Sequence, residues 1–389
     1  MPDNKKQSLI KTLLKVAGFA VVSIALTLAL IALAFWIYSN NAPQFGAKVD
    51  GEARGFTTLS NYGEKDKNHF INTYQTPDAS NPPKLIRTLW NVLARSDETY
   101  PDERLATNPL DIPLATQSDF AVTWLSHSSV LLRQGSRTLL IDPVFSDHAS
   151  PFSWLVERFP GSLPKGVFDL PKVDAVLISH DHYDHLDYDT IKRIDSKVGH
   201  YIVPLGVGEH LVKWGVAPDR ITELNWWQST DFEGLDITLT PAFHSSGRTM
   251  EGSKSTLWGG YAVRSSTQNA FFSGDSAYTP HFKEIGDRLG PFDLAMIECG
   301  QYNTAYPTYH MVPERTYQAA QDVKAAKLLP IHWGGFALSS HGWAEPVIKL
   351  LEVEGSTEVL TPQIGKTFDL SEPLPKSQWW TDIKTENQN

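Results

Sequence analysis

The stretch HDHYDH, residues 180–185, decides which fold and which chemistry this chain is expected to have. It follows a short apolar run with β-branched residues, 173–179, which predicts a buried strand. Side chains two residues apart in an extended chain point the same way, so His180 and His182 can bind one metal ion. The turn that follows would bring the last two residues of the stretch to a second ion. Imidazole and carboxylate ligands without a thiolate suit zinc, or else manganese or iron.

The stretch resembles the His-x-His-x-Asp-His signature of the metallo-β-lactamase superfamily. Three residues further along match that family in order and context, each after a strand-like apolar run. The resemblance implies that His244 completes the first metal position, that His332 completes the second, and that Asp275 bridges both. The seven implied ligands are His180, His182, Asp184, His185, His244, Asp275 and His332. A single histidine at a strand end is usually a surface or core residue, whereas this set predicts a functional metal site; the alternative is a decayed site that keeps the fold.

A carboxylate that bridges two metal ions indicates a hydrolase, because the two ions can then activate one water molecule between them. Two metals held by Asp275 share one solvent molecule, and a bound metal lowers the pKa of water to about 7 in favourable zinc sites. Two divalent ions, the Asp184 and Asp275 carboxylates and one hydroxide leave a net charge of roughly +1. Asp184 and Asp275 are therefore expected to be catalytic as well as ligating. Such a site attracts a phosphate oxyanion, although an ester, lactone or amide carbonyl would also be polarised.

The one cysteine, Cys299, lies outside all of these motifs and ends an apolar run. The commonest true β-lactamases use a cysteine as a metal ligand, so hydrolysis of β-lactam antibiotics is disfavoured. Cys299 is expected to be a packed core thiol, and one cysteine allows no internal disulfide.

A narrower resemblance covers roughly residues 118 to 370, where the chain is similar to the N-acyl-phosphatidylethanolamine-hydrolysing phospholipase D branch and its bacterial relatives. The matching strings are WLSHSSV (124–130), LIDPVFSD (140–147), ASPF (149–152), HMVPE (310–314) and IHWGGFAL (331–338). The resemblance implies cleavage of a phosphodiester in a phospholipid, which releases phosphatidic acid and an N-acylethanolamine. A lactonase or carboxylic-ester hydrolase of the same fold remains the alternative, and a non-catalytic envelope protein that binds metal or lipid is a second.

Two polar residues outside the ligand set are given roles. Asp142 follows a strand and precedes a proline, where it could accept the free ring N–H of a ligand histidine, or merely form a turn. The resemblance places His310 beside the substrate, where it could bind the phosphate or protonate the leaving alkoxide; a capping or surface histidine is the alternative. His127 and His341 are expected to be structural.

The loop 150–165 is rich in large apolar residues. Four of them are expected to form one wall of an acyl-chain groove, the concave apolar setting that a lipid tail requires: Phe152, Trp154, Leu155 and Phe159. Ordinary buried anchoring of the loop accounts for them equally well.

Residues 16–38 carry no charge and are long enough to cross a bilayer as a helix. Four lysines precede this segment, and the next basic residue is Lys48. The positive-inside rule therefore predicts a single-pass anchor in the inner (cytoplasmic) membrane, with the catalytic domain on the periplasmic side. A cleaved signal peptide is the rival, because residues 32–34 read Ala-Leu-Ala.

The domain organisation expected from these features is an α/β chain whose αββα four-layer sandwich is preceded by one transmembrane helix. The expected boundaries are 1–39 for the anchor, 40–117 for an extension that wraps the core, 118–371 for the hydrolase domain and 372–389 for the tail. A net charge of −10 argues against binding nucleic acid, and the oligomeric state is left open, a homodimer included.

Local patterns within this organisation predict individual elements. Strands are expected at 121–132, 138–141 and 237–240, and helices at 84–95 and 316–326. Asp187 is expected to cap a further helix just past the histidine-rich stretch.

Overall fold

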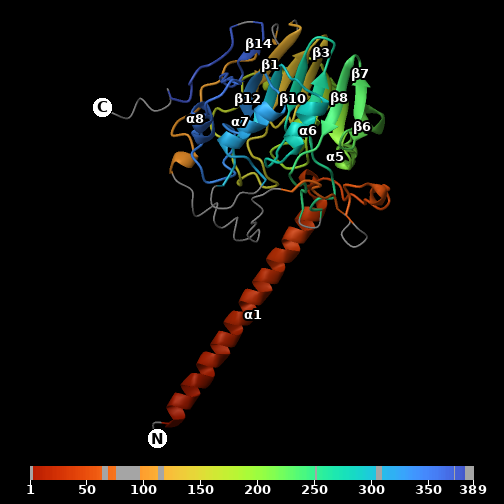
Figure 1. Cartoon of the computed structure of the whole chain (residues 1–389). Coiled ribbons are helices and arrows are strands. Elements are labelled where there is room, and N and C mark those ends of the chain that lie inside the picture. The colour runs from red at the N-terminus through yellow and green to blue at the C-terminus, as the bar shows by residue number, and fades with distance from the viewer. Residues whose placement is uncertain are drawn as a thin grey trace, which may run out of the picture. The chain divides into compact units, whose positions relative to one another are not determined.

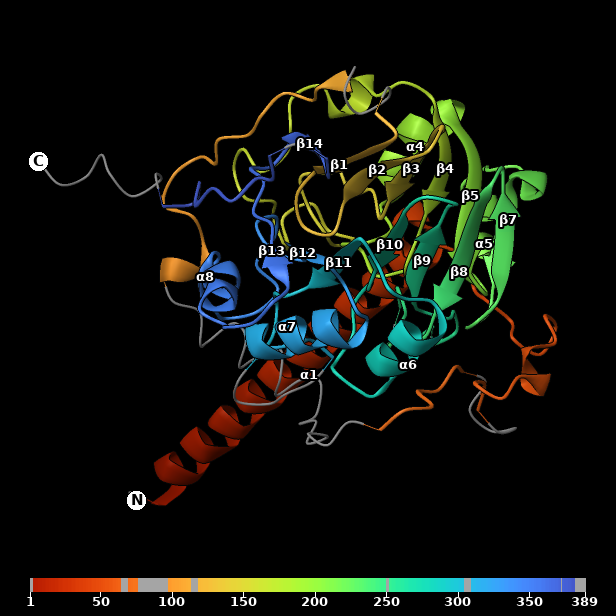
Figure 2. The ribbon, with the colours of Figure 1, turned by 45° about the horizontal axis from the view of Figure 1, so that its top comes forward.

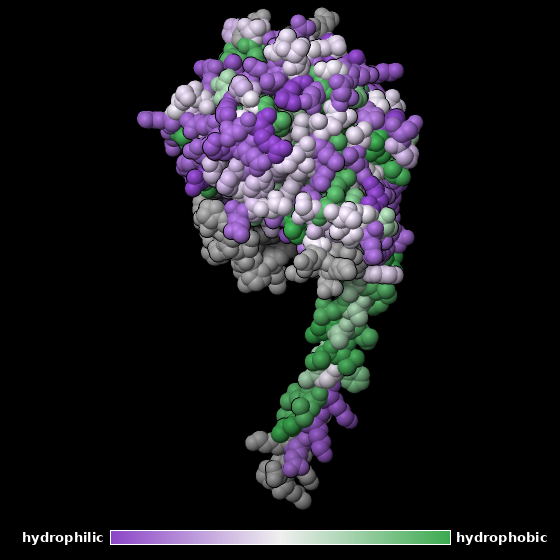
Figure 3. All heavy atoms as spheres, turned by 45° about the vertical axis from the view of Figure 1, so that its right-hand side comes forward, coloured by the Kyte–Doolittle hydropathy of each residue, from purple (hydrophilic) through white to green (hydrophobic). Residues whose placement is uncertain are grey.

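The computed structural model of the chain describes residues 3–63, 69–75, 97–112, 118–249, 252–303, 309–371 and 373–381. It divides into two compact units, Met1–Phe45 and Gly46–Asn389 (Figure 1). The first unit consists mainly of one long helix, α1 (Asp3–Asn41). Figure 3 shows apolar side chains along most of α1 and hydrophilic ones toward its N-terminal end. Among the described residues, α1 is the one helix long and apolar enough to cross a membrane, by length and composition.

The part of the second unit that the structure describes contains two seven-stranded mixed sheets. The first sheet has, in spatial order, β14 (Thr367–Asp369), β1 (Phe120–Trp124), β2 (Val130–Gln134), β3 (Arg137–Ile141), β4 (Val173–Leu177), β5 (Val198–Pro204) and β6 (Ile221–Leu224). Adjacent strands of this sheet pair antiparallel from β14 to β3 and parallel from β3 to β6.

The second sheet repeats this organisation. Its order is β13 (Glu358–Val359), β12 (Lys327–Ile331), β11 (Leu294–Glu298), β10 (Asn269–Phe272), β9 (Gly260–Arg264), β8 (Leu235–Thr240) and β7 (Ser229–Phe232). Strands β7 to β10 pair antiparallel, and β10 to β13 pair parallel.

Helices cover the outer face of each sheet (Figure 2). Two of them, α4 (Tyr188–Ile194) and α5 (Val207–Lys213), pack with the first sheet in one hydrophobic cluster. The other three pack with the second sheet: α6 (His281–Arg288), α7 (Pro313–Asp322) and α8 (Glu345–Leu351). The four-layer αββα sandwich expected from the sequence is therefore confirmed.

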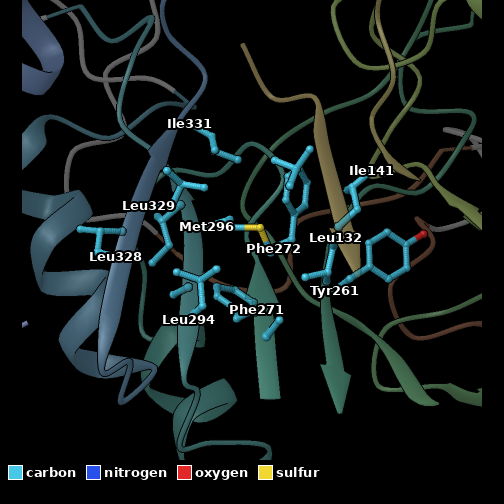
Figure 4. Close-up of a cluster of buried hydrophobic side chains, with 14 of the residues drawn as sticks. Leu132, Ile141, Tyr261, Phe271, Phe272, Leu294, Met296, Leu328, Leu329 and Ile331 are labelled. Carbon is cyan, nitrogen blue, oxygen red and sulfur yellow. The ribbon is translucent and has the colours of Figure 1, made fainter. Parts of the chain in front are cut away.

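The main hydrophobic core lies between the two sheets (Figure 4). Leu132 and Ile141 reach it from the first sheet, and Tyr261, Phe272 and Met296 from the second. All five side chains are fully buried. Close-packed buried side chains between two sheets hold the ends of the strands in fixed positions, which is what a site built from strand ends needs.

Several local predictions are confirmed and others need correction. Strands β3, β4 and β8 lie where apolar runs predicted them. Asp187 caps α4, since its side chain accepts a hydrogen bond from the backbone N–H of Asp189. The single strand expected at 121–132 is wrong: it is the hairpin of β1 and β2, interrupted by a turn of small polar residues at 126–129. The bounds expected for the helix at 316–326 are wrong at both ends: it begins at Pro313, which is favourable at a helix start, and ends at Asp322.

The helix expected at 84–95 lies outside the described residues. The division between the two units falls at Phe45, a few residues after the predicted end of the anchor. The boundaries of the extension, the hydrolase domain and the tail stay predictions.

Candidate metal centre

Most residues of the candidate centre lie at or just beyond the carboxyl ends of strands, which is where open α/β sheets place their sites. Seven strands each carry one residue of the centre, either as their last residue or shortly after it. The pairs are β1 with His127, β3 with Asp142, β4 with His180, β8 with His244, β10 with Asp275, β11 with Glu298 and β12 with His332. Both sheets contribute, so the centre lies where their strand ends meet.

Three histidines form the first group of facing nitrogen atoms. His180 Nε2 lies 2.9 Å from His182 Nδ1, and His244 Nε2 lies 3.3 Å from the same atom. His180 and His244 are fully buried. This is the set that the sequence assigned to the first metal position, and the structure brings its members together.

The second group combines a carboxylate with two histidines. Asp184 Oδ2 lies 3.4 Å from His185 Nε2 and 3.3 Å from His332 Nε2. The turn after the first two histidines does swing Asp184 and His185 away from the first group, because the backbone N–H of His185 bonds back to the carbonyl of His182. The set assigned to the second metal position is therefore also assembled, and the same group includes a further histidine, His127.

Asp275 lies between the two groups. Its Oδ2 atom is 3.8 Å from His180 Nε2 and 3.7 Å from His244 Nε2, on the side of the first group. The same atom is 3.1 Å from His185 Nε2 and 3.2 Å from His332 Nε2, on the side of the second. This is the position that a bridging carboxylate requires, although the bridge itself stays a prediction.

The atoms present in the centre fit divalent metal ions. His185 Nε2 and Asp275 Oδ1 are buried without a hydrogen-bond partner among the described residues. Native proteins leave few buried polar atoms unsatisfied, and a bound ion can satisfy atoms of this kind. The seven side chains offer imidazole nitrogens and carboxylate oxygens aimed at one another, which is the donor set that zinc and related metals take.

The electrostatics of the centre favour ionised carboxylates. Burial would raise the pKa of the Asp275 carboxyl, but the rings of His185 and then His332 outweigh burial and hold it well below its usual range. Burial also acts to raise the pKa of Asp184, and the ring of His185 with a hydrogen bond from His127 holds it well below. Both carboxylates are therefore in the form that binds a cation.

The histidines of the centre differ in protonation: some rings are neutral and others are protonated. Burial lowers the pKa of His180 and of His244 well below the ordinary value, so both rings are neutral, as a ligand must be. Burial acts to lower the pKa of His332 as well, but Asp275 outweighs it and raises that pKa to about 10. Metal binding at the second position would therefore displace a proton.

Asp142 has the orienting contact that the sequence suggested. Its Oδ2 atom lies 2.7 Å from His185 Nδ1, the ring nitrogen that faces away from the centre. The carboxylate also accepts hydrogen bonds from the backbone N–H of Ser179 at 2.7 Å and from its hydroxyl at 2.5 Å. Fixing the outer nitrogen of a ligand histidine sets its tautomer and its ring orientation.

Glu298 is a residue of the centre that sequence reasoning missed. It is fully buried, and its Oε2 atom lies 3.2 Å from His310 Nδ1 and 3.6 Å from His332 Nδ1. Its Oε1 atom accepts backbone N–H groups of Ser276 and Met311. Glu298 and Asp142 thus add two buried carboxyl groups beside the seven predicted ligands.

His310 lies against the centre, as expected, and is held by Glu298. Its ring stacks on that of His332 with centroids 4.9 Å apart, and its Nδ1 atom is 4.0 Å from Asp275 Oδ2. Its side chain is 19% exposed, against 0% for His332, so it reaches solvent. His310 therefore occupies the outer side of the centre, where a substrate group can approach.

His127, expected to be structural, lies within the candidate centre. Its Nε2 atom lies 3.0 Å from Asp184 Oδ2, and its ring is 4.4 Å from that of His332. Burial, followed by the nearby ring of His332, lowers the pKa of His127 to about 3, so the ring is neutral. His341 makes the structural contacts expected of it: its ring accepts a backbone N–H from Gln301.

The structure separates the four apolar residues predicted to line a groove. Phe159 is buried in the main core. Trp154 is 70% exposed and Leu155 45% exposed, while Phe152 is partly buried beside the Trp154 ring. The alternative of a wholly buried loop anchor is wrong for Trp154 and Leu155, and their contact with substrate stays a prediction.

Comparison with known proteins connects this centre to metal-dependent hydrolases. Residues 137–333 match the family model described as "Beta-lactamase superfamily domain". An uncharacterized protein of Mycobacterium tuberculosis is 40% identical over 304 residues, which are 76% of this chain and 81% of that protein. The N-acyl-phosphatidylethanolamine-hydrolyzing phospholipase D 1 of Caenorhabditis elegans is 33% identical over 323 residues, 78% of this chain and 89% of that protein.

A solved structure supports the fold alone. Igni18, described as a novel metallo hydrolase from Ignicoccus hospitalis, aligns with a TM-score of 0.50 at 20% identity. The alignment covers 64% of this chain and 98% of that one.

Proposed function

The chain belongs to the metallo-β-lactamase superfamily of metal-dependent hydrolases, and from this premise we propose that it is a phosphodiesterase of phospholipase D type with two metal ions, most simply zinc. The proposed substrate is an N-acyl-phosphatidylethanolamine-like lipid, and the products are phosphatidic acid and an N-acylethanolamine. The observation that carries this proposal is the placement of Asp275 Oδ2 between two separate groups of ligand atoms.

The metals, when bound, supply an acidified water and positive charge near the phosphate oxygens. The chain's own residues position the reaction. The nearby histidine rings keep the carboxylates of Asp184 and Asp275 ionised, and Asp142 fixes the ring of His185. His310 is held through Nδ1 by Glu298, and we assign it the transfer of a proton to the leaving alkoxide.

The buried charge favours a diester over a monoester. Four buried carboxylates contact the histidines of the centre: Asp142, Asp184, Asp275 and Glu298. Asp184 and Asp275 are ionised, and this negative charge repels a doubly charged monoester more than a singly charged diester. A neutral lactone or carboxylic ester would also be admitted, which keeps those hydrolases as the alternative activity.

We further propose that α1 anchors the enzyme in the inner membrane, with the second unit on the periplasmic side. The length and composition of α1 support this, together with the lysines that precede its uncharged segment. An enzyme tethered in this way meets phospholipid without needing a basic surface, which agrees with the net charge of −10.

The test is hydrolysis of N-acyl-phosphatidylethanolamine by the full chain in ¹⁸O-labelled water, with the products identified by mass spectrometry. Attack at phosphorus breaks the bond to the ethanolamine oxygen and puts ¹⁸O into phosphatidic acid, while the N-acylethanolamine keeps ¹⁶O. Activity should disappear on chelation and return with Zn²⁺. The control is the Asp275→Asn variant.

Labelled fatty acid would instead show attack on a carboxylic ester and would contradict the phosphodiesterase assignment. Turnover of a lactone panel in place of the lipid would favour the lactonase alternative. Bound metal with no turnover on any phosphodiester, ester or lactone would favour a non-catalytic envelope protein.

A further inference from the structure

We propose that the two metal positions are held by separate outer hydrogen bonds, one from Ser179 and one from His127, so that each position can be weakened without the other. Both are positioning residues, because neither belongs to the seven ligands. The proposal rests on the two-metal assignment above and concerns how each position keeps its ion.

Ser179 connects the first position to Asp142. Its hydroxyl oxygen lies 2.9 Å from His180 Nδ1 and 2.5 Å from Asp142 Oδ2. The hydroxyl has one proton, which it donates to the carboxylate, so its oxygen accepts the N–H of His180. That tautomer leaves His180 Nε2 bare, and this is the atom that faces His182. Ser179 is fully buried, so water does not replace the contact.

His185 shares the same carboxylate without needing Ser179. Its Nδ1 atom contacts Asp142 Oδ2 directly at 2.7 Å, whereas the Ser179 hydroxyl is 3.4 Å from it. Removing the hydroxyl therefore releases His180 of the first position and leaves the orientation of His185 in place. One carboxylate thus serves both positions, but only the first needs the serine.

His127 supports the second position from the opposite side. Its Nε2 atom lies 3.0 Å from Asp184 Oδ2, and a carboxylate oxygen only accepts, so the ring donates its N–H to that oxygen. This bond fixes the Asp184 carboxylate. The ring contacts of His127 are with His185, His332 and Phe336, and not with the three histidines of the first position.

The backbone holds His127 firmly in this place. Its φ of +51° is unusual for a residue other than glycine, and its N–H and carbonyl both bond to the chain at 332–333. A β-carbon at Gly335 would lie 2.8 Å from the β-carbon of His127, so glycine is what lets the two loops close. A backbone with a strained φ angle and hydrogen bonds at both its N–H and its carbonyl gives a positioning residue the support that it requires.

The experiment measures metal binding, not hydrolysis, so its failure is separate from failure of the proposed substrate. Full-length protein in detergent is stripped of metal and titrated with Co²⁺. The stoichiometry comes from native mass spectrometry, and the downfield imidazole signals in the proton spectrum identify which position holds the ion. The variants are Ser179→Ala and His127→Leu, each serving as the control for the other.

We expect Ser179→Ala to weaken binding at the first position by about ten-fold or more and to leave the second within about two-fold, and His127→Leu to do the reverse. Ser179→Thr and His127→Gln keep a hydroxyl or an N–H and should restore binding. Should Ser179→Ala fail to fold, Ser179→Cys replaces it, since a thiol is a weak hydrogen-bonding group. Equal loss at both positions in either variant, no loss in either, or no rescue by the conservative variants would overturn the proposal.

Discussion

Single residues of the candidate centre are held in backbone conformations that side chains rarely adopt. Asp142, His127 and His332 have φ values of +42°, +51° and +68°. Each such residue costs about 1–3 kcal/mol and persists only where the surroundings determine it fully. Seven other non-glycine residues of the described chain also have positive φ, so what distinguishes these three is that their side chains all lie in the candidate centre.

Glu298 gives a prediction at this scale. Glu298→Gln keeps the size of the side chain but replaces by a neutral amide the carboxylate that lies 3.2 Å from His310 Nδ1. We expect kcat to fall by about 10- to 100-fold, as when a carboxylate that positions a residue of a metal site is lost. The measurement is steady-state kinetics on a soluble phosphodiester, together with metal content.

The matched control is Glu345→Gln, since Glu345 accepts a hydrogen bond from Tyr302 and touches no histidine of the centre. Its kinetics should remain close to wild type. Wild-type kcat in Glu298→Gln would show that the carboxylate has no role in positioning His310.

Spacing at a strand end predicts the ligands of the stretch 180–185, because it is a local signal. The resemblance to the superfamily adds His244, Asp275 and His332 and favours the orienting role of Asp142. Glu298 gives no such signal: it ends an ordinary buried strand, and its importance comes from three distant segments, at 276, 311 and 332, that meet around it only in the folded chain. His127 is similar, because its partner Asp184 lies 57 residues away.

At the scale of elements, every strand that supplies a residue of the centre is short and mostly buried, and a loop or turn follows it. The hairpin of β1 and β2 shows where apolar runs alone mislead: they predict one strand over 121–132, although the four polar residues of 126–129 between two apolar runs are a turn signal. The turn carries His127 toward the centre, so one missed turn conceals both the hairpin and the role of the histidine.

The loop that carries Trp154 and Leu155 gives the prediction for this scale. Both side chains are exposed, so they can bury apolar surface only against something outside the domain. We expect Trp154→Ser with Leu155→Ser to lower turnover of long-chain phospholipid at least about ten-fold, since burying one large apolar side chain contributes about 1.5–3 kcal/mol.

Turnover of a small soluble phosphodiester should be nearly unchanged in this double variant. Ile348→Ser with Leu351→Ser on α8 is the control, because these side chains are 45% and 39% exposed on another element. Equal losses on both substrates, or the same lipid-specific loss in the α8 variant, would count against contact between the loop and lipid.

At the scale of the whole molecule, the chain combines an apolar helix with a separate hydrolase fold. The αββα sandwich was predictable because the histidine-rich stretch identifies its family, and the apolar helix because its length and lack of charge are those of a membrane span. The substrate was not predictable from the metal motif, since binding residues are disproportionately found on loops, and the loop at 150–165 is the candidate here.

The central claim is that the seven side chains hold two metal ions through a shared carboxylate. Its most direct test is the number of divalent ions per chain in purified full-length protein, by elemental analysis, in wild type and in Asp275→Asn. We predict two ions in the wild type, and in the variant a fall in both occupancy and rate by orders of magnitude, since the bridge serves both positions. Full occupancy with near-normal hydrolysis in Asp275→Asn would contradict the account.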